Sequence, residues 1–207
     1  MKNVNECIEC KMKKQLILIL LICFCMISSA QEEFGQCILK ALTNVDSTVG
    51  DTIYNSLKWQ DCVMNKPVPD VKFTTITGRK IELKKLQGKV VVFNFWFSAC
   101  IPCIEEIPAL NRLAKEYKNK GVEFFGITYD SYKTLKSKFL PKHKFDFNIV
   151  CDVMNLTETF SAGYPTTYII DKKGIVRMVW SGGFTGEEAK TAAYLKAKPM
   201  IDELLTK

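Results

Sequence analysis

The feature that most constrains this chain is an apolar run that leads directly into a Cys-x-x-Cys pair and then into an amphipathic segment. Residues 90–95 predict a buried strand, and residues 101–118 repeat apolar side chains at helical spacing. Cys100 then stands at the N-terminus of a helix, with Cys103 one turn inside it. Unpaired backbone N–H groups and the positive end of the helix dipole favour a thiolate there. Because a thiolate is the species that attacks disulfides, the arrangement predicts thiol–disulfide redox chemistry.

The chain downstream of residue 66 alternates between strand and helix patterns. Apolar or alternating runs predict strands at 71–75, 80–83, 90–95, 122–128, 147–151, 166–170 and 175–180. Helical spacing predicts helices at 101–118, 132–140, 155–162 and 187–205, the last bent or interrupted near Pro199. The fold class is therefore α/β: a sandwich in which helices flank a central mixed sheet of parallel and antiparallel strands.

Residues 1–30 have the pattern of a signal peptide: two lysines, a run of 12 apolar residues at 16–27, then small residues at 28–30. The run is shorter than the ~20 residues that a membrane-spanning helix needs. We therefore expect a cleaved signal, an exported periplasmic or extracytoplasmic protein, and no stable membrane span. An uncleaved signal would leave the protein membrane-associated. Met12 also fits a natural start, in which case residues 1–11 would not belong to the protein.

Residues 31–65 predict a helical extension, and residues 66–207 the main domain, because Lys66-Pro-Val-Pro-Asp70 interrupts the helical pattern. After cleavage at residue 30, five cysteines remain: Cys37, Cys62, Cys100, Cys103 and Cys151. Disulfides persist in exported proteins, and an odd count leaves one thiol over. The sequence leaves open whether Cys37 and Cys62 pair. Cys151 lies in an apolar run and is expected to be a core residue.

The charge of the mature chain is mildly basic. Removing the four lysines and two glutamates of residues 1–30 from the totals of 29 basic and 22 acidic residues leaves 25 and 20, a net charge of +5. The excess is spread along the chain rather than clustered. It therefore favours solubility and argues against nucleic acid as a partner.

Several motifs together resemble one family. Residues 94–103, Asn-Phe-Trp-Phe-Ser-Ala-Cys-Ile-Pro-Cys, followed by Glu-Glu-Ile-Pro-Ala-Leu at 105–110, resemble the thioredoxin-like disulfide reductases of the TlpA and ResA type. The match continues through Pro-Val-Pro-Asp at 67–70, Leu-Gln-Gly-Lys at 86–89 and Gly-Tyr-Pro-Thr-Thr-Tyr-Ile-Ile-Asp at 163–171. The resemblance covers residues 66–205 and implies a thioredoxin-like fold of the AhpC/TSA and redoxin type.

The resemblance also implies catalytic roles. Cys100 would be the attacking thiol and Cys103 the resolving thiol of a dithiol–disulfide cycle. Glu106 would accept a proton near the thiols, because Asn94 stands where thioredoxins carry a buried aspartate. The Ile-Pro pair between the cysteines differs from that of cytosolic thioredoxins and of strong oxidases, so the direction of the reaction stays open.

Three further residues are expected to bind the substrate. Pro165 would be a cis-proline whose missing N–H shapes a groove for a partner chain. Tyr164 would present backbone groups to that chain. Trp96 is placed at the edge of the site, as a packing platform beside the thiols.

The function that follows is an exported thiol–disulfide oxidoreductase that reduces disulfides of exported client proteins. Haem-attachment apoproteins are one client class that the resemblance implies, with a membrane electron donor to recharge the enzyme. One alternative is a peroxidase of the peroxiredoxin type, which needs a Thr or Ser where Phe97 stands, three residues before Cys100. Another is a copper-binding thiol module, whose relatives use Cys-x-x-x-Cys spacing and a distal His.

Cofactor and metal sites are not predicted. Zinc needs about four ligands, and His143, the single histidine, lies in a polar Lys-His-Lys stretch and is expected to be solvated.

Overall fold

The computed structural model describes residues 34–37, 58–161 and 163–207, together with positions 13 and 15. Apart from those two positions, the predicted signal peptide lies outside the described residues, as does most of the predicted extension. Within the part of the chain that is described, no helix is long and apolar enough to cross a membrane.

A five-stranded mixed sheet forms the centre of the molecule, in the order β5-β4-β3-β6-β7. The strands are β3 (Val90–Phe95), β4 (Val122–Ile127), β5 (Asn148–Val150), β6 (Thr166–Ile170) and β7 (Val176–Ser181). β3 pairs in parallel with β4 and antiparallel with β6, and all six of its residues are buried. A strand buried on both faces has a continuous apolar sequence, so the run at 90–95 takes the central position.

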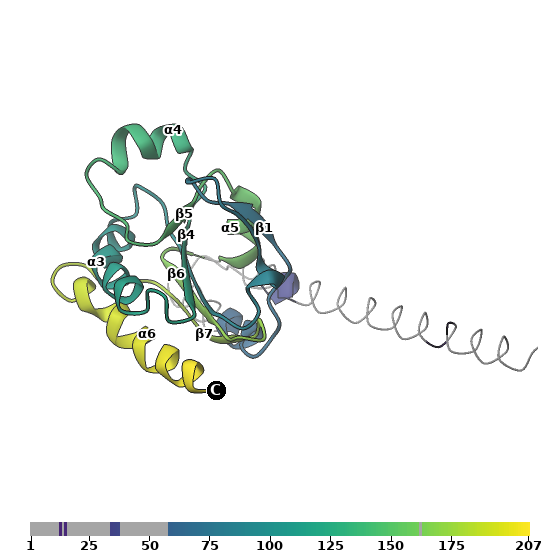
Figure 1. Ribbon diagram of the computed structural model, residues 1–207. Helices are drawn as coiled ribbons and strands as arrows, with labels where there is room; N and C mark the ends of the chain where they lie inside the picture. The colour runs from purple at the N-terminus through teal and green to yellow at the C-terminus, as the bar shows by residue number, and fades with distance from the viewer. Residues whose placement is uncertain (1–12, 14, 16–33, 38–57, 162) are drawn as a thin grey trace, which may run out of the picture.

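Helices and a hairpin cover the two faces of the sheet (Figure 1). On one face α3 (Ile101–Glu116) packs against α6 (Ala189–Thr206), with a shared apolar cluster beneath them. The other face is covered by α5 (Met154–Phe160) and by a hairpin of β1 (Lys72–Thr74) and β2 (Lys80–Glu82), which leads into a 3₁₀ turn, η1 (Leu83–Leu86). The layered α/β sandwich with a central mixed sheet, predicted from the sequence, is confirmed.

The described parts of residues 31–65 belong to the core of the same domain. Positions 34–37 and 58–63 are helical, and Phe34 and Trp59 are 0% and 1% exposed in the cluster under the sheet. Cys37 and Cys62 form a disulfide with Cα atoms 5.7 Å apart. The sequence had left open whether these two cysteines pair. These residues therefore fill the second face of the sheet rather than standing apart from it.

Two helices differ from expectation. The last helix, predicted to be bent or interrupted near Pro199, is not interrupted, since α6 runs through the proline as one helix. Buried residues on both sides of the proline hold the two halves against the core: Ala193, Ala197, Ile201 and Leu204. The helix predicted at 132–140 is a short α4 (Tyr132–Thr134) that continues as a π-helical turn, η2 (Leu135–Phe139).

Candidate active site

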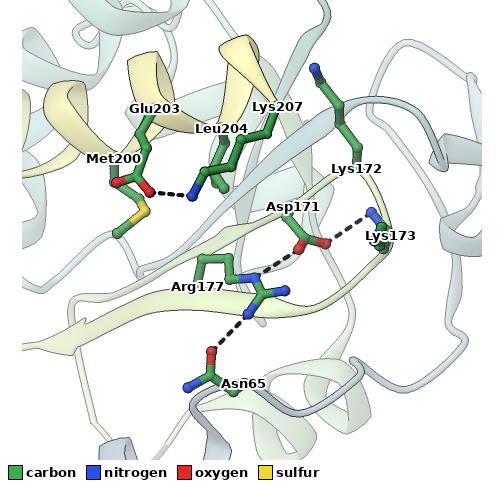
Figure 2. A pocket seen from close by; sticks show the side chains of 9 residues that line it. All are labelled: Asn65, Asp171, Lys172, Lys173, Arg177, Met200, Glu203, Leu204 and Lys207. Atoms are coloured by element: carbon green, nitrogen blue, oxygen red, sulfur yellow. Dashed lines mark hydrogen bonds and ion pairs between the residues drawn. The ribbon is translucent and has the colours of Figure 1, made fainter.

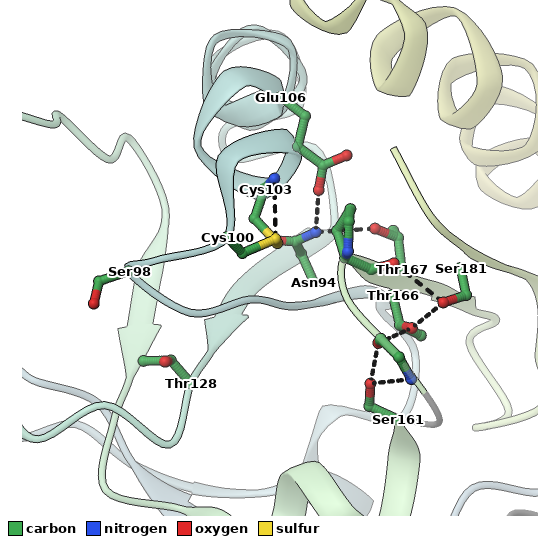
Figure 3. Close-up of a disulfide and its surroundings, with 12 residues drawn as sticks. Asn94, Ser98, Cys100, Cys103, Glu106, Thr128, Ser161, Thr166, Thr167 and Ser181 are labelled. Carbon is green, nitrogen blue, oxygen red and sulfur yellow. Dashed lines mark hydrogen bonds between the residues drawn. A yellow bond between two sulfur atoms is a disulfide. The ribbon is translucent and has the colours of Figure 1, made fainter. Parts of the chain in front are cut away.

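The cysteine pair lies at the start of α3, where the chain leaves β3. Cys100 is the N-cap residue of α3, and its Sγ accepts a hydrogen bond from the backbone N–H of Cys103 at 3.3 Å. The two side chains form a disulfide with Cα atoms 5.3 Å apart (Figure 3). Cys100 is 6% exposed and Cys103 1% exposed. Cys100 is therefore the sulfur that a partner reaches first.

Glu106 lies one helical turn beyond Cys103 and is buried, with 3% of its surface exposed. Residues three apart on a helix are neighbours, which places its carboxyl on the face of α3 that carries Cys103. The Nδ2 of Asn94 donates to Glu106 Oε1 at 2.7 Å and to Thr167 Oγ1 at 3.0 Å, a hydrogen-bonded chain that Figure 3 shows. Burial raises the pKa of Glu106 to about 7, against the opposing effect of the Asn94 hydrogen bond.

The peptide bond between Tyr164 and Pro165 is cis, as the resemblance implied. It immediately precedes β6, whose first residue, Thr166, pairs with Phe95 at the end of β3. The cis peptide and the start of α3 therefore meet at the same edge of the sheet. Proline has no N–H, and Pro165 O accepts a hydrogen bond from Gly182 N–H at 2.8 Å.

Gly183 is a site residue that the sequence reasoning did not single out as functional. A Cβ at this position would lie 2.9 Å from Cγ of Pro165 and 3.4 Å from Cβ of Pro102. Real Cβ atoms do not approach a neighbouring ring that closely, so only glycine fits between the two prolines. No local sequence signal marks it, since a Gly-Gly pair before a helix equally predicts an ordinary turn.

An aromatic cluster beside the cis peptide was also missed. The ring centroids of Phe97 and Tyr129 lie 5.5 Å apart and stacked, and the Tyr164 ring meets Phe97 edge-on at 5.1 Å. All three side chains are half-buried. They come from the loops after β3 and β4 and from the segment before β6, so only the tertiary fold brings them together.

Trp96 does not reach the surface of the site. Its side chain is 1% exposed and packs against both Phe139 and Phe145, with each ring centroid 5.0 Å away. The expected role as a packing platform beside the thiols fits this position. Only 1% of its surface is exposed, and a role of Trp96 in substrate binding stays a prediction.

The remaining thiol and the histidine take structural positions. Cys151 is half-buried, and burial raises the pKa of its thiol to about 11, so it stays protonated at neutral pH. His143 stacks on Phe139 at 4.2 Å between ring centroids, which differs from the solvated position expected for it. In the described part of the chain, no group of three or more His, Cys, Asp or Glu side chains could hold a metal ion.

A cavity of about 480 Å³ lies at the opposite end of β6 from Pro165, between the β6–β7 turn and the end of α6 (Figure 2). Its charged side chains bind one another: Arg177 Nε donates to Asp171 at 2.7 Å, and Lys207 pairs with Glu203. No cysteine lines it. It is therefore separate from the site of disulfide chemistry.

Comparison with known proteins agrees with this geometry. Residues 64–179 match the AhpC/TSA family. A thiol-disulfide oxidoreductase ResA of Bacillus cereus (strain ZK / E33L) is 36% identical over 132 residues, which are 62% of this chain and 76% of the relative. The thioredoxin-like protein YneN of Bacillus subtilis (strain 168) is 32% identical over 124 residues, 58% of this chain and 72% of the relative.

Among solved structures, a putative thiol:disulfide interchange protein DsbE from Chlorobium tepidum superposes with a TM-score of 0.57 at 25% sequence identity. The superposition covers 67% of this chain and 97% of that protein. Fold, cysteine pair and sequence relatives agree, and the chain therefore belongs to the AhpC/TSA family, as a thioredoxin-fold thiol–disulfide oxidoreductase of the ResA type.

Proposed function

We propose that this oxidoreductase is exported and reduces disulfides of exported client proteins through a Cys100–Cys103 dithiol–disulfide cycle. The observation that carries the proposal is the buried carboxyl of Glu106, one turn from the buried sulfur of Cys103. A resolving thiol that lies out of solvent needs a nearby base to release its proton, and Glu106 would act as that base.

In the first step the Cys100 thiolate attacks one sulfur of the client disulfide. A Cys100–client bond forms, and the second client sulfur leaves as a thiolate with the electron pair of the broken bond. The N-terminus of α3, with the Cys103 N–H aimed at Cys100 Sγ, stabilises the attacking thiolate. Tyr164 packs against the apolar cluster that contains Cys100, and Tyr164 and Pro165 would align the client chain.

In the second step Cys103 gives its proton to Glu106 and attacks Cys100 Sγ. The Cys100–Cys103 disulfide forms, and the remaining client sulfur leaves as a thiolate. Two electrons have then passed from the enzyme to the client. The bonded pair in this structure corresponds to the product of this step.

Two observations support export. The Cys37–Cys62 bond is a second disulfide beside the reactive pair, and such bonds persist in oxidising compartments. The pattern of residues 1–30 is that of a signal peptide. In such a compartment a membrane electron donor would reduce the Cys100–Cys103 disulfide back to the dithiol. Family analogy suggests haem-attachment apoproteins as one class of client.

A peroxidase of the peroxiredoxin type is less well supported by the site. Phe97 occupies the place of the required Thr or Ser and packs against Tyr129 and Tyr164. The chain has three arginines, and each interacts elsewhere: Arg79 with Glu123, Arg112 with the Tyr194 ring, and Arg177 with Asp171.

The deciding experiment is the equilibrium reduction potential of the Cys100–Cys103 pair, measured by dithiothreitol titration of the mature chain. A value near that of thioredoxin, about −270 mV, is expected for a reductase. A value near about −120 mV would recast the protein as a disulfide donor. Peroxide consumption or tight copper binding by the reduced protein would favour one of the two alternatives.

A further inference from the structure

A small cavity of about 50 Å³ adjoins Glu106, between the loop that follows β7 and helix α6. Small residues form much of its wall: Gly182, Gly183, Ala189, Ala192 and Ala193. A larger side chain on this face of α6 would fill the space. The loop is also held to α3, because Gly186 N–H donates to Glu105 Oε2 at 2.7 Å.

The Glu106 carboxyl has one oxygen left for this cavity. Oε1 accepts the Asn94 hydrogen bond, while no described residue donates to Oε2, which points away from Asn94 in Figure 3. A cavity holds a water when the volume open to it reaches ~10–15 Å³ and polar partners are present. The space beside Glu106 therefore has room for a few waters, with the free carboxyl oxygen as their anchor.

The outer end of the cavity reaches the surface. Phe184, which is 51% exposed, and Lys196, also exposed, line it together with the 3% exposed Glu106. Lys196 Nζ lies 5.0 Å from the centroid of the Trp180 ring, which forms part of the same wall. The lining includes neither Cys100 nor Cys103 and neither residue of the cis peptide. The cavity is therefore separated from Pro165 by Gly182 and Gly183, which contact that proline.

We propose that this cavity is the proton exit of Glu106: water in it carries the proton taken from Cys103 out to solvent, past Ala192 and Lys196. The inference rests on the proposed role of Glu106 as the base for Cys103. In the resolving step the Cys103 S–H bond breaks and a Glu106 O–H bond forms. Cavity water then takes that proton to bulk solvent and restores the carboxylate for the next turnover, while the electron pairs move only between sulfurs.

The surroundings of Glu106 suit a group that gains and loses a proton near neutral pH. Asn94 from β3 and Thr167 from β6 are neutral, Cys103 on α3 supplies the proton, and the cation of Lys196 on α6 lines the outer wall. Burial raises the pKa of Glu106 to about 7. A carboxyl of that pKa both accepts and releases protons readily at neutral pH.

The test measures proton exchange at Glu106 directly, in the oxidised full mature chain and without a client. The pH is jumped from below to above the Glu106 pKa, and the infrared carbonyl band of the protonated carboxyl is followed in time. The band is assigned by its loss in Glu106→Gln. Ala192→Leu, which fills the cavity, is compared with Thr191→Leu, which places the same leucine side chain at the exposed neighbouring position of α6.

We expect Ala192→Leu to slow proton loss on the order of tenfold or more, a modest part of the ~10²–10⁴-fold that positioned proton transfer contributes. Thr191→Leu should leave the rate unchanged. Phe184→Ala, at an exposed position, should fold normally and speed the exchange by widening the mouth. Equal rates in the wild type, Ala192→Leu and Phe184→Ala would overturn the proposal.

The result of the proton-exchange experiment does not depend on whether the enzyme reduces or oxidises its clients. A potential near that of strong oxidants would overturn the reductase assignment while leaving the exchange rates of Glu106 as they are. Conversely, unchanged exchange rates in a protein with a thioredoxin-like potential would refute only the proton exit. If Ala192→Leu does not fold, the acceleration expected in Phe184→Ala still decides the matter.

Discussion

Glu106 combines a titratable group with almost complete burial. Its carboxylate is stabilised by one hydrogen bond, from the neutral amide of Asn94, which does not offset the loss of hydration. The consequence is a pKa raised from the ordinary 4.5 to about 7, and such a shift links the stability of the fold to pH.

Replacing Glu106 by Gln should remove that pH dependence. A folded-state pKa of about 7 against 4.5 means that stability is greatest below pH 4.5 and is lost as the pH rises through 7. As the pH rises from 4.5 to 7, the free energy of unfolding of the oxidised Gln variant should therefore gain roughly 3 kcal/mol relative to that of the wild type. Denaturant unfolding at a series of pH values measures this difference in the free energy of unfolding. If the free energies of the wild type and the variant changed with pH in parallel, that result would contradict a raised pKa of Glu106.

The same variant should slow the resolving step. Loss of a positioned base costs ~10²–10⁴-fold, so mixed disulfide between Cys100 and a client peptide should accumulate in Glu106→Gln. Quenched-flow trapping of the mixed disulfide detects it. Normal resolution with no accumulation would remove Glu106 from the mechanism.

Gly183→Ala should damage the site without touching either cysteine. Its Cβ would lie 2.9 Å from the Pro165 ring, so the cis-proline segment must shift. We expect a destabilisation of ~1–3 kcal/mol from overpacking and a larger loss of rate with a folded protein disulfide than with dithiothreitol. An equal loss with both reagents would mean that the groove at Pro165 does not align clients.

At the scale of elements, three loops meet at one edge of the sheet. The loop after β3 carries Phe97 and Cys100, the loop after β4 carries Tyr129, and the segment before β6 carries Tyr164. Their half-buried rings form an apolar surface beside the reactive sulfur, and such surfaces bind partners through a few aromatic contacts.

Phe97→Ala should therefore weaken client binding. Aromatic pairs contribute about 0.5–1.5 kcal/mol each beyond buried area, so KM for a disulfide-bridged peptide should rise several-fold. Reduction of the enzyme by dithiothreitol, which needs no docking surface, should be unaffected. Tyr132→Ala, an exposed aromatic on α4, is the matched control. An unchanged KM in Phe97→Ala would place the client elsewhere.

At the scale of the whole molecule, the Cys37–Cys62 bond joins residues 25 positions apart and ties the helical residues 34–37 into the core. Replacing both cysteines by serine should lower the free energy of unfolding by about 3 kcal/mol, mainly by freeing the unfolded chain. The Cys100–Cys103 potential should not change. Cys151→Ser serves as the control for loss of a thiol alone, and a stability unchanged in the double variant would show that the bond is not structural.

Thiol trapping in cells that produce the full chain tests which of the two cysteine pairs is oxidised and whether the protein resides in an oxidising compartment. For an exported reductase fed by an electron donor, Cys37 and Cys62 should resist alkylation while Cys100 and Cys103 are modified. Modification of all four would show that the protein resides in a reducing compartment. Protection of all four would indicate an oxidase.

The sequence by itself determined the local elements and the chemistry at the start of α3. An apolar run followed by Cys-x-x-Cys and an amphipathic segment forces a buried strand, a capped helix and a thiol at its N-terminus, because those features depend on neighbours in the chain. The same holds for the layer order of the sandwich, which follows from the alternation of strands and helices.

Only the tertiary structure decided which residues from distant parts of the chain surround the N-terminus of α3. Gly183 between two prolines, the rings of Phe97, Tyr129 and Tyr164, the burial of Trp96 and the small residues beside Glu106 depend on segments up to 87 positions apart, the separation of Glu106 from Ala193. Such contacts are set by how the sheet and helices pack, and no local pattern of side chains encodes that packing. The pKa of Glu106 belongs to the same group, since burial by other elements causes it.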